Sequence, residues 1–327
     1  MIRVPERIAD HLLDIAHRLD ESPKYCLRED ANGFVLELVQ ANRVRYTSDK
    51  PINVACVPQR SPFRYPGGKT WLVPYIRDWL KNKKAPPARL IEPFAGGGIV
   101  SLTAAFERLA RHVIFAEMDE GVAAVWRMVL NGQAEWLAKQ ILNFEVTLET
   151  VTTTLHKEAP GLREKAFQTI LRNRVQRGGI LAAGAGLVKT GENGRGLLSR
   201  WYPQTLARRI REINRQKDRL TFVEGDGFDL IEEHKADAEA VFYIDPPYTV
   251  AARRLYAVWQ VDHARLFEAM AGCRGDFLMS YDNTAEIAQL AKRHGFESRP
   301  IARSKSPGKV STHLLIGKKL SEWLTMK

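Results

Sequence analysis

The pattern of apolar and polar positions changes about sixty residues into the chain. Before that point, helical apolar spacing over residues 8–19 predicts a helix, and alternation over 25–46 predicts a β-hairpin that turns at 30–33. After it, short β-rich runs alternate with helical stretches, which is typical of a parallel sheet covered by helices. We therefore expect a small amino-terminal extension over residues 1–60 and an α/β domain over 61–327.

The expected strands are short apolar runs that end in polar or turn residues. They cover residues 89–94, 112–117, 220–226, 240–245 and 276–281, with 296–302 and 311–318 as a closing antiparallel pair. Residues 130–215 interrupt this rhythm because they are long, mostly helical in pattern and broken by a glycine-rich loop. A connection of that length between two strands indicates an inserted subdomain.

The positive charge of the chain is concentrated in this insert. The formal net charge of the whole chain is +11. Between Arg163 and Arg219, fourteen Lys or Arg residues stand against four acids, which leaves +10 on that segment. A basic segment of this density attracts phosphate backbones through the release of counterions. A solvated helix face is the alternative, and the concentration of charge in one segment favours nucleic acid.

Composition indicates the compartment in which the protein is expected. No apolar run reaches the roughly 20 residues that a membrane span needs, and the amino terminus lacks the apolar core of a signal peptide. Cys26, Cys56 and Cys273 are odd in number and form no CxxC pair, which fits a reducing compartment. The eight histidines show no ligand-like spacing. We expect a cytoplasmic protein with no membrane segment and no metal.

The most informative motif is Asp245-Pro246-Pro247-Tyr248, which closes the apolar run 240–244. Its two prolines fix φ and remove two backbone donors, so the turn is stiff and its carbonyls point outward. The motif places a carboxylate, a rigid carbonyl and an aromatic face at one strand end. Asp245 and the Pro246 carbonyl could accept the two hydrogens of an adenine amine, and Tyr248 could stack on a base extruded from a duplex.

A glycine-rich turn follows the first expected strand. Glycines over residues 96–98, between a strand and a helix, let the backbone approach a ligand closely. Glu117 ends the second strand about twenty residues later, where nucleotide-binding folds place an acid on ribose hydroxyls. Gly96-x-Gly98-x-x-Ser101 is equally compatible with a dinucleotide-binding dehydrogenase. The turn therefore predicts a nucleotide-like cofactor without choosing between the two.

A further glycine element, residues 64–70, ends in Gly68-Lys69-Thr70 as a P-loop does. A P-loop requires glycine at position 63, and this chain has Phe63 there. No strong strand precedes the element either. We therefore reject an ATPase interpretation.

Taken in order, residues 64–70, 92–98 and 245–248 resemble the α-group of adenine-specific DNA methyltransferases, the family that contains the Dam-type enzymes. The resemblance covers residues 61–320. Asn173-Arg174, the glycine-rich loop and residues 200–203 are similar to the family's target-recognition region, and residues 303–316 to its basic carboxy-terminal hairpin. The loop over 179–186 is smaller and more apolar than in Dam-type enzymes, so the resemblance assigns no target sequence.

The resemblance implies a Rossmann-like α/β sheet of the S-adenosylmethionine-dependent methyltransferases, with a mostly helical target-recognition subdomain inserted over 130–215. The catalytic domain would span residues 61–327, and the role of residues 1–60 stays open. The implied cofactor is S-adenosyl-L-methionine. The residues implied to hold it are Tyr65, Gly67, Lys69, Phe94, Ala95, Gly96, Gly98, Glu117, Met118, Asp226 and Phe228.

The implied reaction is methyl transfer to the N6 amine of a flipped adenine in double-stranded DNA. Its catalytic residues would be Asp245, Pro246 and Tyr248. The implied contacts to DNA are Arg172, Asn173, Arg174, Arg177, Arg195 and Arg200. We expect a monomer, with companion restriction or defence proteins left open. A base-amine methyltransferase acting on structured RNA, and a DNA-binding regulator without catalysis, remain the alternatives.

Overall fold

The computed structural model describes residues 2–4, 25–30, 33–38, 54, 57–65, 67–182, 184–191, 194–247, 261–306 and 309–324. The predicted helix over 8–19 and the predicted catalytic Tyr248 lie outside these ranges.

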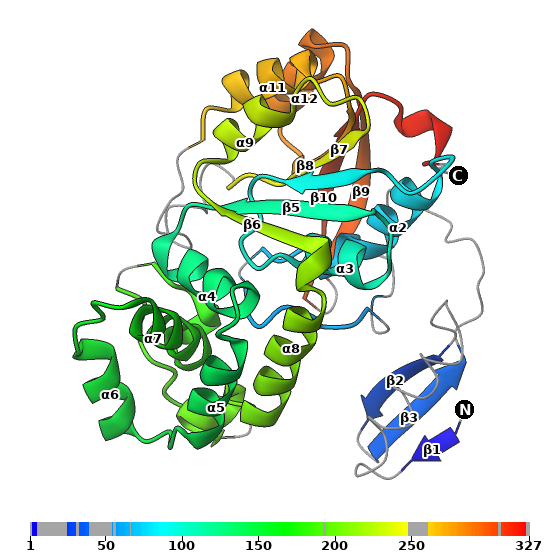
Figure 1. Ribbon diagram of the computed structural model, residues 1–327. Coiled ribbons are helices and arrows are strands. Elements are labelled where there is room, and N and C mark those ends of the chain that lie inside the picture. The colour runs from blue at the N-terminus through cyan, green and yellow to red at the C-terminus, as the bar shows by residue number, and fades with distance from the viewer. Residues whose placement is uncertain are drawn as a thin grey trace.

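The centre of the molecule is a mixed sheet that contains all the strands predicted after residue 60 (Figure 1). Its order is β6-β5-β4-β7-β8-β10-β9. Strands β4 to β8 are parallel, and β10 runs antiparallel to both β8 and β9. The bounds are β4 (Arg89–Glu92), β5 (His112–Glu117), β6 (Leu220–Glu224), β7 (Ala240–Ile244), β8 (Asp276–Asp282), β9 (Glu297–Ser306) and β10 (Lys309–Gly317). The fold is therefore the predicted Rossmann-like α/β sheet with a closing antiparallel pair.

The sequence of β7 explains why it lies in the interior of this sheet. All of its residues, Ala240–Ile244, are buried, as expected for a strand covered by helices on both faces. In register, Ile91 of β4 lies between Ile114 of β5 and Phe242 of β7. The chain order reverses between β4 and β7, and such a switch point leaves a crevice at the carboxyl ends of the strands.

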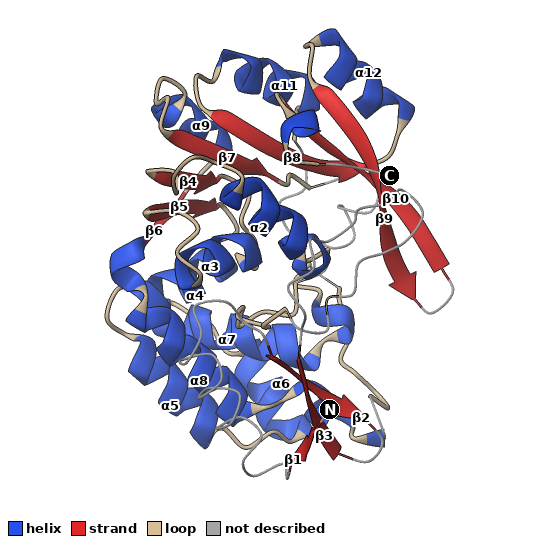
Figure 2. Cartoon of the chain, turned by 90° about the vertical axis from the view of Figure 1, so that its right-hand side faces the viewer, coloured by secondary structure: helices blue, strands red, loops and turns tan. Residues whose placement is uncertain are grey.

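Helices cover both faces of the sheet (Figures 1 and 2). On one face lie α9 (Gly227–His234), α11 (His263–Gly272) and α12 (Ala285–Arg293). On the other lie α2 (Val73–Lys81), α3 (Ile99–Phe106) and α4 (Glu120–Leu130). Each face has its own hydrophobic cluster, with Phe267 of α11 in one and Val100 of α3 in the other.

The insert forms a helical layer below α4 (Figure 1). Its helices are α5 (Ala134–Asn143), α6 (Leu148–His156), α7 (Leu162–Val175) and α8 (Pro203–Arg215), and α7 and α8 both pack against α4. Short 3-10 turns are η1 (Thr70–Leu72), η2 (Arg177–Gly179), η4 (Gly196–Arg200), η5 (Lys217–Arg219) and η6 (Leu320–Glu322). Helix α8 buries Leu206, Ala207, Ile210 and Ile213, a helical apolar stripe, and is otherwise rich in arginine.

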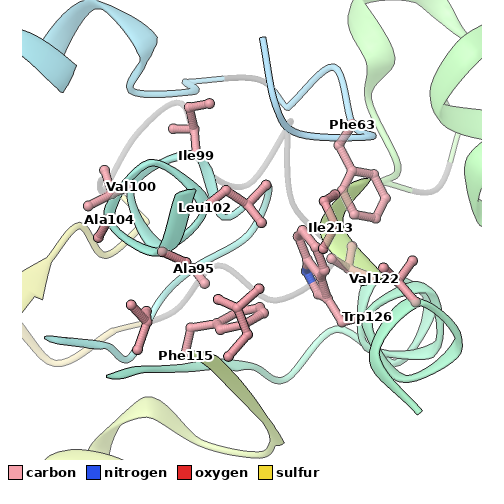
Figure 3. Close-up of a cluster of buried hydrophobic side chains, with 14 of the residues drawn as sticks. Phe63, Ala95, Ile99, Val100, Leu102, Ala104, Phe115, Val122, Trp126 and Ile213 are labelled. Carbon is pink, nitrogen blue, oxygen red and sulfur yellow. The ribbon is translucent and has the colours of Figure 1, made fainter. Parts of the chain in front are cut away.

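The insert and the sheet share one core. Ile213 of α8 points toward Trp126 of α4, which packs edge-on against Phe115 of β5 with ring centroids 5.2 Å apart (Figure 3). Phe63 lies on the other side of Trp126, at 5.7 Å. All four side chains belong to the same buried cluster. The insert is therefore anchored to the sheet through α4 rather than by a flexible link.

The amino-terminal strands form a separate sheet of order β1-β3-β2. Strands β2 (Tyr25–Asp30) and β3 (Gly33–Leu38) are antiparallel with Asp30 opposite Gly33, which confirms the predicted hairpin turn. Strand β1 (Ile2–Val4) also pairs with β3 and was not predicted. Across the described part of the chain, no helix is both long and apolar enough to span a membrane.

Candidate active site

A cavity of about 920 Å³ opens at the carboxyl ends of β4, β5, β6 and β7. Each of these strands contributes the residues that directly follow it. They are 93–98 after β4, Met118 after β5, 225–228 after β6 and 245–247 after β7, and Glu92 and Glu117, the last residues of β4 and β5, also line the cavity. Parallel strands end at the same edge of a sheet, so residues more than a hundred positions apart meet in one crevice.

The glycine turn after β4 forms one wall of the cavity. Gly96 and Gly98 have φ of 51° and 62°, the left-handed region in which side chains are strained. A Cβ on Gly96 would lie 2.5 Å from Cε1 of Tyr65, and one on Gly98 would lie 3.0 Å from Cζ2 of Trp126. The Trp126 Nε1 also donates to the Gly96 carbonyl at 3.0 Å. The turn therefore offers bare backbone to the cavity while its outer side is tightly packed.

Glu92 ends β4 beneath this turn and is only 3% exposed. Its Oε2 accepts from the Ser101 backbone at 2.8 Å and from the Ser101 hydroxyl. Burial, with a further contribution from the charge of Asp245, raises the pKa of Glu92 to about 8. Its surroundings therefore favour the protonated form of Glu92, which lines the cavity. The sequence analysis did not select Glu92, although its place at a strand end beside a glycine turn was a usable signal.

Glu117, at the end of β5, also has a raised pKa. Its Oε1 accepts from the backbone nitrogens of Met118 and Asp119, both at 2.8 Å. Burial outweighs these bonds and raises the pKa of Glu117 to about 7. The carboxyl group lines the cavity beside the half-exposed Met118.

The residues after β6 form the next wall. Asp226 caps α9, since its Oδ1 accepts from the Phe228 backbone at 2.9 Å. The buried Phe228 ring meets Phe94 edge-on at 6.1 Å, and the Arg265 guanidinium lies 4.3 Å from its centroid. Asp226 and the two aromatic rings all line the cavity, which makes this wall suited to a flat ring with an amino group.

Asp245 is held from two directions. Its Oδ2 lies 2.7 Å from the Lys69 ammonium, and its Oδ1 accepts from the Ser280 hydroxyl at 2.9 Å. The Tyr243 hydroxyl is 3.0 Å from the same serine oxygen, and Lys69 also donates to the Gly67 carbonyl at 3.0 Å. The ion pair joins segments 64–70 and 245–247, which the sequence analysis singled out separately. It orients the carboxylate, while the adjoining Pro246 also lines the cavity.

A comparison with family models finds a match that covers part of this region. Residues 65–176 match the family model of the D12 class N6 adenine-specific DNA methyltransferase. This confirms the resemblance predicted from the motifs. The match includes the glycine turn, Glu117 and the whole of α7, and it ends before Asp245. No curated protein sequence matches the chain.

Solved structures give more distant similarities. A methyltransferase described as S-adenosylmethionine-dependent, from Agrobacterium tumefaciens, is 10% identical over 96% of this chain and 78% of its own, with a TM-score of 0.39. The rRNA methyltransferase aviRa from Streptomyces viridochromogenes is 14% identical over 86% and 98%, with a TM-score of 0.40. A putative RNA methyltransferase from Pyrococcus horikoshii is 11% identical over 84% and 91%, with a TM-score of 0.35. Because these TM-scores are all below 0.5, the assignment of the fold rests on the strand order described above.

The methyltransferase motifs converge on one place. Every residue implied to hold the cofactor lines the cavity, as do Asp245 and Pro246. Tyr248 lies outside the described residues. No group of side chains that could hold a metal occurs within the described ranges.

The predicted DNA contacts separate into three groups. Arg174 and Arg200 line the cavity, whereas Arg177 and Arg195 are exposed on the insert. Arg172 lies on α7. Its Nη2 donates to the Leu155 carbonyl of α6 at 3.4 Å and to the Gln168 side chain of α7 at 3.3 Å. Arg172 therefore supports the packing of the insert, and this differs from its predicted role.

Asn173 is the clearest departure from the predicted contacts. It is 0% exposed, and its amide accepts from the Arg64 backbone at 2.8 Å. It also donates to the carbonyls of Arg64, at 3.1 Å, and Gly179, at 2.9 Å. A side chain enclosed in this way cannot reach DNA. Asn173 instead fastens the segment before α2 to the start of the glycine-rich loop.

Proposed function

We propose that this protein transfers a methyl group from S-adenosylmethionine to the N6 amine of an extruded adenine in duplex DNA. The observation that carries the proposal is the position of Asp245, at the end of β7, in the same cavity as the Gly96–Gly98 turn and Glu117. The family match supports DNA adenine as the substrate. A dehydrogenase would leave Asp245 and the basic insert without a role.

The residues of the cavity fit S-adenosylmethionine. Position 96 requires glycine because a Cβ there would clash with Tyr65, and the bare backbone of the turn lines the cavity, where the centre of the cofactor would lie. Glu117 would accept from the ribose hydroxyls, Met118 and Phe228 would pack on the adenine ring of the cofactor, and Asp226 would meet the amino group of that ring. Tyr65, Gly67 and Lys69 would lie at the methionine end, and Phe94, Ala95, Gly96 and Gly98 around the centre. When bound, the cofactor supplies an electrophilic methyl group on a sulfonium.

The Asp245 corner would prepare the nucleophile. An adenine amine is weakly nucleophilic because its lone pair is delocalised into the ring. Asp245 and the Pro246 carbonyl would accept its two hydrogens, which favours a pyramidal nitrogen with an available lone pair. Lys69 and Ser280 fix the orientation of the Asp245 carboxylate at the end of β7 for this purpose. Fixed geometry then supplies much of the rate, and the proton lost from nitrogen leaves toward the carboxylate.

Transfer of tritium from methyl-labelled S-adenosylmethionine tests the proposal. Duplex DNA, single-stranded DNA and ribosomal RNA fragments serve as parallel substrates, and nucleoside chromatography identifies the product. We expect N6-methyladenine in duplex DNA. Methylation confined to RNA would instead support the RNA alternative, and cofactor-independent DNA binding without transfer would support the regulator. Methylation-aware sequencing of DNA from cells that express the chain then gives the target site.

A further inference from the structure

Four arginines line the cavity from the side of the insert. Arg174 comes from α7, Arg200 from η4, Arg209 from α8 and Arg64 from the segment before α2. The acids of the cavity are elsewhere. Glu92, Glu117, Asp226, Asp245 and Asp262 come from the strand ends and the start of α11. All five acids of the cavity therefore lie on the sheet side, together with Lys69 and Arg265, whereas the insert side carries four arginines and no acid.

Arg174 is the most enclosed of the four. It is 4% exposed, its Nη2 donates to the Pro62 carbonyl, and its buried Nε has no partner among the described residues. Burial and the charges of the other three arginines lower the pKa of Arg174 to about 9. A buried donor without a partner costs free energy, as does an uncompensated buried charge. Both costs fall if an anion enters the cavity beside it.

The neighbouring arginines add to this excess of charge. Arg209 donates to the Ser61 carbonyl at 3.1 Å, and burial lowers its pKa to about 10. Burial and the charge of Arg200 also lower the pKa of Arg64. Within the described ranges, Arg64, Arg174 and Arg209 form no ion pair with a carboxylate. The planar fork of a guanidinium suits the oxygens of a phosphate, so converging forks form a phosphate-binding arrangement.

We propose that Arg64, Arg174, Arg200 and Arg209 form a subsite for one phosphate of the DNA backbone beside the extruded adenine. The proposal rests on the proposed function and adds Arg64 and Arg209, which were not among the predicted DNA contacts. The exposed Tyr202 also lines the cavity, so its basic side reaches the surface, as a phosphate that remains part of a duplex requires. Holding this phosphate would fix the distance between the backbone and Asp245 and so position the base.

Inorganic phosphate tests the anion subsite without DNA. The melting temperature of the full chain is measured in rising phosphate against chloride of equal ionic strength. The variants are Arg64→Gln, Arg200→Gln and, as a control, Arg293→Gln at an exposed position of α12. Arg64 is suitable because its bonds to Asn173 use its backbone, which the substitution keeps. We expect phosphate to raise the melting temperature of the wild type and the control, and to have little effect on Arg64→Gln or Arg200→Gln. An equal rise in all four proteins overturns the subsite.

Cofactor binding separates a backbone phosphate from the carboxylate of the cofactor. Calorimetry with S-adenosylmethionine should give the same affinity, within about twofold, for the wild type, Arg64→Gln and Arg293→Gln. A tenfold loss in Arg64→Gln alone would assign the cluster to the cofactor carboxylate and overturn the proposal.

Neutral linkages in DNA then locate the phosphate. Duplexes with the target site carry one methylphosphonate at a time. We expect one linkage beside the target adenine to weaken wild-type binding about tenfold, the scale of one charge-assisted hydrogen bond. The same linkage should not weaken DNA binding by Arg64→Gln any further, because the effects of removing two groups that contact each other are not additive. Additive losses overturn the contact. If phosphate acts through Arg64 but DNA is neither bound nor methylated, the proposed function and the DNA source of the phosphate fail, while an anion subsite stands.

Discussion

The two sides of the cavity are built in different ways. On the sheet side, the acids at strand ends either end a strand or directly follow it, as Glu117 ends β5 and Asp245 follows β7. On the insert side, Arg174 comes from the last turn of α7 and Arg209 from the middle of α8, and both helices also contribute to the hydrophobic core. The strand ends supply the acids, which the proposed function assigns to a cationic cofactor and an amine, and the insert supplies four arginines. The comparison shows that one crevice can draw acidic and basic groups from two different parts of the fold.

The largest expected effect is on the sheet side. Asp245→Ala should lower kcat for methyl transfer by about 10³-fold, within the range for a positioned proton acceptor. The dissociation constants for cofactor and DNA should change little, because the insert and the glycine turn remain. Steady-state kinetics and calorimetry measure the two quantities, with the exposed Asp229→Ala in α9 as the control. Equal losses in binding and turnover would show that Asp245 serves the fold.

The second largest expected effect is at the core that the sheet and the insert share. Trp126→Ala should lower the free energy of unfolding by about 3–5 kcal/mol, since Trp126 is 0% exposed. Because Trp126 belongs to a core shared by β5 and the insert, hydrogen exchange should rise in β5 and in α8 together. Trp136→Ala, at a half-buried position of α5, should cost less. Faster exchange confined to α8 would mean that the insert folds independently of the sheet.

The protonation of the sheet side gives a further test. Glu117 contacts a ribose best as a carboxylate, and its pKa is raised to about 7, so cofactor affinity should increase as the pH rises through that value. Binding should release protons, which calorimetry detects in buffers of different ionisation enthalpy. Glu117→Gln should weaken binding about tenfold and remove most of this release. An unchanged affinity in Glu117→Gln would contradict the ribose contact.

The smallest expected effects are on the exposed part of the insert. Arg177→Gln and Arg195→Gln should each weaken DNA binding modestly and reduce the salt dependence by about one phosphate contact. Arg172→Gln should leave the salt dependence unchanged, because Arg172 bonds to Leu155 and Gln168 within the insert. Titrations at several salt concentrations measure the slopes. A flatter slope in Arg172→Gln would return this residue to the DNA contacts.

Much of the sheet side could be predicted because its signals are local. The apolar run before Asp245, the glycines at 96–98 and the acid at Glu117 each belong to one short segment, and parallel strands bring such ends together. The raised pKa of Glu92 and the contacts of Ser280 and Tyr243 with Asp245 depend on burial and on neighbours far along the chain. No short-range pattern records them.

The sequence by itself determined the order of strands and helices, the glycine turn and the Asp245 corner, because periodicity and turn chemistry act over a few residues. Only the tertiary structure decided which basic residues face the cavity. Asn173 and Arg172 make hydrogen bonds within the protein, whereas Arg64, Arg174 and Arg209 line the cavity. The reason is physical. The net charge of a segment is the same whichever way its helix is turned. The direction and burial of each side chain depend instead on the core against which that helix packs.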